Sequence, residues 1–117
     1  AASYVCQNKE GQIQKTESIS AGLDYPGVSP VHCFLKDTTR ARYTYATDED
    51  SLNAYQMVTN FEKLNPSLEP SHAFAEAIKI APKLSKDTII IVNSCGDAKK
   101  DRDILKEKLG KKIWTPQ

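Results

Sequence analysis

The sequence has few of the features that mark membrane, secreted and zinc-binding proteins. No apolar run approaches the roughly 20 residues needed to cross a bilayer, and the longest lies around residues 89–92. Residues 1–4 show no basic region followed by an apolar one, so no secretory signal is expected. The three cysteines are odd in number and widely spaced, which favours neither a disulfide framework nor a zinc site. These absences predict a cytoplasmic protein without a membrane partner.

The sequence also has no large excess of positive or negative charge. The chain has 16 Lys and Arg against 15 Asp and Glu, for a formal net charge of +1. The lysines of residues 99–112 are interspersed with acidic residues and no aromatic platform accompanies them, which indicates a solvated helix face and no nucleic-acid partner. A length of 117 residues with 39% apolar residues suits one globular domain.

Hydrophobic patterning predicts strands and helices that alternate along the chain. A hairpin is expected within residues 1–17, then a loop rich in Gly, Ser and Pro over 18–30. The elements expected after this loop are a short helix at 31–36, a strand at 41–46, helices at 49–63 and 71–84, a strand at 88–93 and a helix at 101–109. The buried side of the helix at 71–84 is expected to carry Ala73, Phe74, Ala77, Ile78, Ala81 and Leu84.

The run at 88–93 decides the expected fold class. Its apolar residues do not alternate with polar ones, which is typical of a parallel strand buried on both faces. We therefore expect an α/β fold: a partial parallel sheet in three layers with flanking helices, built from βα units over residues 41–110. Ligands of such sheets bind beyond the carboxyl ends of the strands. The loops after 45–46 and after 92–93 are thus the places to look.

Four short features carry candidate chemistry, each with a plainer alternative. The segment 93–96, Asn-Ser-Cys-Gly, either faces a ligand or is an ordinary βα turn with a passive cysteine. Glu69 is either functional or a helix-start charge. His72 is more simply a structural histidine than a base, and Asp24 is a turn residue or a ligand-facing carboxylate.

Taken together, these residues resemble the tryptophan synthase β family over about residues 4–110. The specific block is Ser18-Ile19-Ser20-Ala21-Gly22-Leu23-Asp24-Tyr25-Pro26-Gly27-Val28. Further matching blocks, in the family's order, are Tyr4-Val5-Cys6-Gln7, Glu10-Gly11-Gln12-Ile13, Pro30, His32, Arg42-Tyr43, Ala46-Thr47-Asp48-Glu49, Leu68-Glu69-x-Ser71-His72-Ala73 and Ile91-Val92-Asn93.

The resemblance implies the C-terminal part of a type II fold that binds pyridoxal phosphate (PLP). On this view residues 1–117 are one incomplete domain, and 18–30 are an active-site loop. The family is a lyase that joins indole to an aminoacrylate made from L-serine, giving L-tryptophan. It implies as partners the N-terminal half of the β chain, a second β chain and a tryptophan synthase α chain.

The resemblance also implies roles for individual residues. Glu69 matches the carboxylate beside the cofactor ring, and Asp24 matches the aspartate that meets the substrate hydroxyl. The backbone of Tyr25 and Gly27 matches a monovalent-cation site. Cys95, followed by Gly96, stands where the family usually has the serine that pairs with the pyridine nitrogen, and a thiol donates more weakly there.

Several family features are missing from these 117 residues. The usual Gly-Arg-Gly-Asp-Lys-Asp appears at 96–101 as Gly-Asp-Ala-Lys-Lys-Asp, and Ser29 replaces a usual glycine. The Schiff-base lysine, the glycine-rich phosphate loop and the catalytic glutamate lie upstream in the family. We therefore expect an inactive fragment of an active parent. The alternatives are a standalone, non-catalytic binding or subunit-interaction module, or another type II PLP lyase such as a threonine synthase relative, against which the Asp24 block argues.

Overall fold

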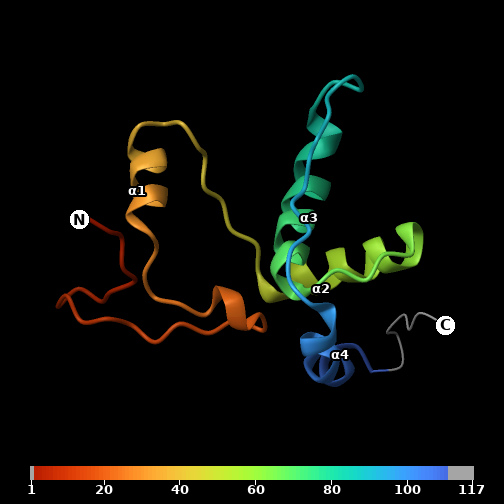
Figure 1. Cartoon of the computed structure of the whole chain (residues 1–117), viewed down its shortest axis with the longest axis horizontal. Helices are drawn as coiled ribbons and strands as arrows, with labels where there is room; N and C mark the ends of the chain where they lie inside the picture. The colour runs from red at the N-terminus through yellow and green to blue at the C-terminus, as the bar shows by residue number, and fades with distance from the viewer. Residues whose placement is uncertain (1, 111–117) are drawn as a thin grey trace. The chain divides into compact units, whose positions relative to one another are not determined.

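A computed structural model describes residues 2–110 of the chain and is mostly helical (Figure 1). The chain divides into two compact units, with the boundary between Thr44 and Tyr45. The single domain predicted over 1–117 also includes residue 1 and residues 111–117, which lie outside the described residues. Each unit is described below by itself.

The first unit begins with the remnant of the expected hairpin. Gln7 and Ile13 form one antiparallel bridge, and Gln14 donates its backbone N–H to the Cys6 carbonyl at 2.9 Å. The turn between them is closed by the Asn8 side chain, which accepts the backbone N–H of Gln12 at 2.8 Å. Over the described part of 1–17 the pairing amounts to this bridge and does not extend into strands, so the hairpin stays a prediction.

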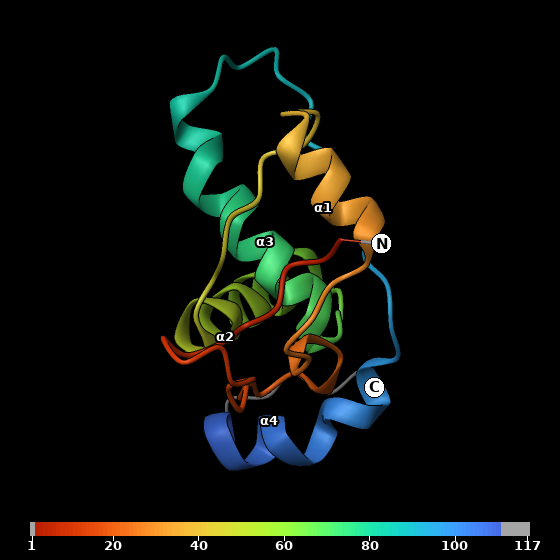
Figure 2. The ribbon, with the colours of Figure 1, turned by 90° about the vertical axis from the view of Figure 1, so that its left-hand side faces the viewer.

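The rest of the first unit is a loop followed by a helix (Figure 2). The loop at 18–30 contains a 3-10 turn, η1 (Ala21–Leu23), and a second bridge joins Val5 to Gly27. Helix α1 (Pro30–Asp37) confirms the short helix expected at 31–36, and it starts with proline in its first turn, where a missing N–H costs nothing. The Tyr4 hydroxyl donates a hydrogen bond to Asp37 at 2.6 Å, which ties the N-terminal segment to the C-terminal end of α1.

The second unit is built around two packed helices, α2 (Asp48–Met57) and α3 (Leu68–Ile80). Thr47 and Asp50 form a capping box at the start of α2. The helix continues into a π-type turn, η2 (Val58–Glu62), and ends at Lys63 in the left-handed conformation. The buried apolar core of the second unit consists of Ala54, Tyr55 and Val58, together with Leu68 from α3 and Leu105 near the end of the described chain.

Helix α3 starts three residues before the expected cap. Its N-cap is Ser67 and not Ser71, and Pro70 lies inside the first turn, which a proline tolerates. The helix is followed by a 3-10 turn, η3 (Ala81–Lys83). Its expected buried side is largely uncovered in the described residues: Ile78 is 37% exposed and Leu84 42%, while burial concentrates at Leu68, Pro70 and Ser71.

The chain ends its described part in η4 (Ala98–Asp101) and helix α4 (Arg102–Leu109), as expected for 101–109 with Gly110 as the stop. Asp97 caps η4 by accepting the backbone N–H of Lys99 at 2.9 Å. Leu105 is the buried anchor of α4. Lysines 111 and 112 of the expected basic tail lie outside the described residues.

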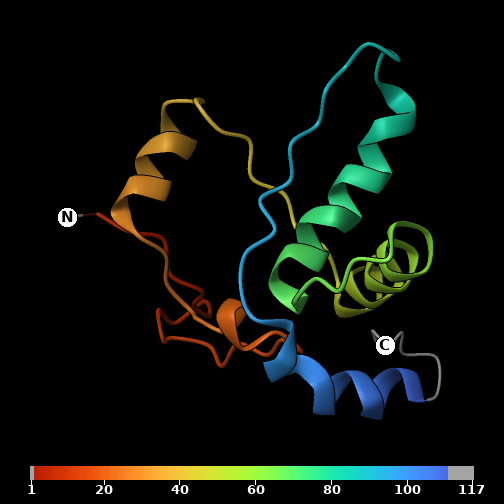
Figure 3. The same ribbon diagram turned by 45° about the vertical axis from the view of Figure 1, so that its right-hand side comes forward.

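The expected sheet is not formed among the described residues, and this corrects the predicted strands at 41–46 and 88–93. Figure 3 shows the stretch between α3 and α4 as an extended trace. Ile89 is 85% exposed and Ile91 90% exposed, so the run predicted to be buried on both faces is open to solvent. The physical reason is that a strand needs a hydrogen-bonding neighbour, and within residues 2–110 no segment pairs with this one.

Candidate functional site

The turn after the extended stretch lies against the first turn of α3. The Ser67 hydroxyl donates a hydrogen bond to the Cys95 carbonyl at 2.8 Å. A second contact comes from the start of α4, where the Asp101 carboxylate accepts the backbone N–H of Leu68 at 2.7 Å. This N–H has no partner inside its own helix, so Asp101 supplies the cap that Ser67 does not. Residues 95–101 are therefore fixed onto the N-terminus of α3.

Gly96 makes this close approach possible. It has φ +86°, a conformation that glycine adopts at low cost. A Cβ at this position would lie 2.5 Å from the Ser67 hydroxyl oxygen and 3.6 Å from Glu69 Oε2. The structure thus brings together Glu69 and the Cys95–Gly96 turn, two predicted site features that are separated by 25 residues or more in the sequence.

The Glu69 carboxylate sits in a cluster of three charged side chains. Its Oε1 accepts a hydrogen bond from the Lys100 ammonium group, and Lys100 Nζ is also 4.0 Å from Asp101 Oδ1. The side chain of Glu69 is 16% exposed and that of Lys100 is 40% exposed. The hydrogen bond to Glu69 raises the pKa of Lys100 above its ordinary value. Burial raises the pKa of Asp101, partly offset by the Leu68 N–H and by Lys100.

The other candidates near this cluster have simpler surroundings. Cys95 is an exposed, free thiol, so its side chain is accessible. The His72 ring nitrogen Nδ1 lies 2.7 Å from the Leu68 carbonyl one turn earlier in α3. This local contact favours the structural interpretation of His72 over a base.

The remaining predicted site residues lie in the first unit. Asp24 is an exposed residue that follows η1, and its backbone N–H donates to the Ala21 carbonyl at 3.4 Å. Tyr25 is 72% exposed, while Gly27 is held by its bridge to Val5. No cluster of three or more His, Cys, Asp or Glu side chains suited to a metal ion occurs within residues 2–110. The roles of Asp24 and of the cation-binding backbone stay predictions.

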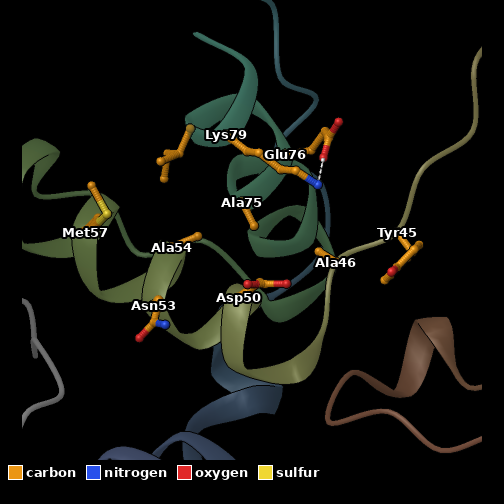
Figure 4. Close-up of a pocket in the computed structure, with 10 residues that line it drawn as sticks. Tyr45, Ala46, Asp50, Asn53, Ala54, Met57, Ala75, Glu76 and Lys79 are labelled. Atoms are coloured by element: carbon orange, nitrogen blue, oxygen red, sulfur yellow. Dashed lines mark ion pairs between the residues drawn. The ribbon is translucent and has the colours of Figure 1, made fainter. Parts of the chain in front are cut away.

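A groove between α2 and α3 opens near the start of α2 (Figure 4). It encloses about 300 Å³, and its lining residues are Tyr45, Ala46, Asp50, Asn53, Ala54, Met57, Ala75, Glu76, Ile78 and Lys79. Lys79 and Glu76 form an ion pair across 3.9 Å on its rim. The loop after 45–46, expected to face a ligand, borders this groove, which holds none of the predicted site residues.

Sequence reasoning missed three residues of the Glu69 cluster: Ser67, Lys100 and Asp101. The patterning places Ser67 before the helix expected at 71–84, Lys100 before the helix expected at 101–109, and Asp101 at the start of that helix. A lysine next to an aspartate at a helix start carries no signal for a contact made 31 residues away. Only the fold reveals it.

Among the described residues, none of the helices combines the length and apolar character needed to cross a bilayer.

Comparison with known proteins identifies the relatives of the chain. No family model matches it. It is 51% identical over 107 residues to the tryptophan synthase beta chain of Bordetella petrii, a match that covers 92% of this chain and 27% of the relative. The same protein of Allorhizobium ampelinum is 51% identical over 98 residues, covering 84% of this chain and 24% of the relative. That of Cereibacter sphaeroides is 50% identical over 107 residues, covering 92% and 26%.

The chain thus spans about a quarter of the length of the curated relatives it matches. The chain is therefore homologous to the tryptophan synthase beta chains, over about a quarter of their length.

Proposed function

We propose that this chain is the C-terminal segment of a tryptophan synthase β chain, whose whole form condenses indole with L-serine to give L-tryptophan using PLP. The observation that carries the proposal is the contact of the Cys95–Gly96 turn with the first turn of α3. It places a thiol-bearing turn and the Glu69 carboxylate side by side. These are the two groups that the resemblance assigns to the edge of the cofactor ring.

The residues present fit one edge of a PLP ring. Cys95 offers an accessible thiol as a weak partner for the ring nitrogen, and the missing side chain of Gly96 lets this turn lie against Ser67. Glu69 offers a carboxylate beside them. When bound, PLP supplies the electron sink for the chemistry at the amino-acid substrate. Asp24 would meet the substrate hydroxyl, and the backbone of Tyr25 and Gly27 would hold a monovalent cation.

The rest of the PLP site is proposed to lie in another part of a longer protein. A Schiff-base lysine and a phosphate-binding loop, which the family has upstream, are not recognisable in this sequence. The exposed run 88–93 supports the same proposal, because four β-branched residues in an extended stretch are typical of a strand in a sheet. We propose that 41–46 and 88–93 pair there with strands of the N-terminal part, completing the three-layer sheet.

The proposed function also implies partners for the chain. The assembly would be a pair of β chains with a tryptophan synthase α chain that supplies indole. We also propose a cytoplasmic location, which fits the free thiols of all three cysteines.

The test is complementation between two polypeptides. The chain would be coexpressed with the Bordetella petrii beta chain truncated before the homologous segment, and conversion of indole and L-serine to L-tryptophan would be followed with added PLP. We expect activity from the pair and from neither piece alone. Glu69→Gln in this chain should lower the activity at least tenfold, which corresponds to about 1.4 kcal/mol of transition-state stabilisation. His72→Gln should leave the activity within about twofold.

Binding of PLP provides the opposing outcome. If the chain alone binds PLP through one of its own lysines, as judged by absorbance and by mass after borohydride reduction, the proposal of an incomplete site is wrong. If the pieces associate without any activity, the chain is better described as a non-catalytic subunit-interaction module. The altered residues at 97–99 would favour that second function.

A further inference from the structure

The two oxygens of the Glu69 carboxylate have different surroundings. Oε1 receives the Lys100 ammonium group, whereas Oε2 lies on the side of Gly96, 3.6 Å from its Cβ position. An ion pair that is fixed at one oxygen sets the rotation of the whole carboxylate, because the two oxygens share one plane. The direction in which Oε2 points thus depends on where Lys100 stands.

The backbone that carries Lys100 is itself anchored on both sides. Asp97 caps η4 through the Lys99 N–H at 2.9 Å, and Asp101 accepts the Leu68 N–H at 2.7 Å. Asp101 is 4% exposed, so this second anchor is buried. Lys100 lies between the two anchors, and only its side chain is free to search for a partner. Such pre-organisation lowers the entropy lost on forming the ion pair.

The charges that face Lys100 are all negative. They come from Glu69 in α3, Asp97 before η4 and Asp101 in η4, and the Asp101 Oδ1 atom is 4.0 Å away. Without an ammonium group between them, the Glu69 and Asp101 carboxylates would repel each other. Lys100 therefore compensates this repulsion as well as holding Glu69.

We propose that Lys100 is a positioning residue for Glu69, which aims the Oε2 atom at the Cys95–Gly96 turn. The inference rests on the proposed function only in taking Glu69 as the carboxylate beside the cofactor ring. Lys100 itself touches neither substrate nor cofactor in this scheme. It sets the orientation of the group that does.

The first experiment measures the orientation of Glu69 in the 117-residue chain by NMR. In the unaltered protein we expect nuclear Overhauser effects between the Glu69 Hγ and Gly96 Hα protons. Lys100→Met should remove them, and Lys100→Arg should keep them, because arginine preserves the charge. Lys99→Met is the matched control, since Lys99 is an exposed neighbour in the same turn. Effects that persist in Lys100→Met would overturn the inference.

The second experiment covers the case in which Lys100→Met does not fold. The Lys100 Cε resonance would be titrated with pH in the unaltered chain and in Glu69→Gln. We expect the pKa of Lys100 to fall in the variant, because the hydrogen bond to Glu69 raises it. Glu76→Gln is the control, as Glu76 pairs with Lys79. An unchanged Lys100 titration in Glu69→Gln would refute the coupling.

The proposed function and the positioning role of Lys100 can be refuted independently of each other. Both NMR experiments use the chain alone, so a complementation that yields no tryptophan would end the proposed function and leave the Lys100–Glu69 coupling intact. Conversely, activity from the complemented pair, with unchanged Overhauser effects in Lys100→Met and an unchanged Lys100 titration in Glu69→Gln, would end the positioning role alone.

Discussion

At the scale of single residues, Gly96 carries two constraints at once: a positive φ and a neighbour where a side chain would stand. Gly96→Ala should lower the free energy of unfolding by about 1–3 kcal/mol, since left-handed backbone costs about 1–2 kcal/mol and the new methyl group meets Ser67. Gly110→Ala isolates the first constraint, because φ there is +59° and nothing lies within 4 Å of its Cβ position. Urea unfolding of both variants measures the difference. Equal losses would show that the contact with Ser67 relaxes freely.

Asp101 gives a second prediction at this scale, in its pH dependence. Burial raises its pKa, so the folded chain binds more protons than the unfolded chain from pH 3.8 up to the folded-state pKa. Stability contributed by this group therefore falls as pH rises through that interval. The free energy of unfolding of the unaltered protein, relative to that of Asp101→Asn, should be highest below pH 3.8 and should fall toward neutrality. Urea unfolding at several pH values tests this, with the exposed Asp103→Asn as control. A relative gain on raising the pH would contradict it.

At the scale of elements, the start of α2 follows from its sequence alone. Thr47 accepts the Asp50 N–H at 3.1 Å, and the Asp50 carboxylate accepts the Thr47 N–H at 2.9 Å. The backbone hydrogen bond from Thr47 lowers the pKa of Asp50. Thr47→Ala should cost about 1 kcal/mol of unfolding free energy in urea, and Thr47→Ser only a few tenths. A serine variant as unstable as the alanine one would exclude the capping hydrogen bond as the cause.

The helices were predictable because their signals are local. Thr47, Gly110 and the apolar spacing of α2 act over a few residues. The predicted ranges therefore match α1 and α4 to within one residue, and the predicted 49–63 matches α2 together with η2 equally well. The start of α3 was misplaced because its cap, Asp101, comes from 33 positions further along the chain. The site shows the same division. Glu69 and Cys95 were found through resemblance to known motifs, whereas the contacts that join them exist only in the fold.

The strands failed for a related reason. Four consecutive β-branched residues at 89–92 state a preference for extended backbone, and the segment is extended. Pairing and burial, however, require a second segment beside this one, and the described residues provide no such segment. The pattern therefore predicted the conformation correctly and the environment wrongly.

At the scale of the whole molecule, the exposed segment 88–93 governs how the chain behaves in solution. Its Ile89 and Ile91 side chains are 85% and 90% exposed, and no charged residue lies between Asp87 and Asp97. Open, apolar and uncharged strand-forming segments associate edge to edge. Ile91→Lys should reduce concentration-dependent association at least severalfold with little change in unfolding free energy, because so exposed a side chain adds little to folding.

Sedimentation velocity over a range of concentrations provides the measurement. Phe61→Lys is the control, since Phe61 is 76% exposed but lies in the helical turn η2 and not in a predicted strand. Association that is reduced equally by both substitutions would point to general solubility instead of strand pairing.

The π-type turn at Val58–Glu62 has a consequence for engineering the chain. Hydrogen bonds in such a turn reach one residue further than in an α-helix, so the winding holds a surplus residue. Excising one exposed position there, such as Asn60, would let α2 wind regularly to its end. Because the wider turn already accommodates the surplus residue locally, its removal would leave the path of the chain toward Ser67 nearly unchanged. A one-residue deletion would in this way be absorbed within the helix.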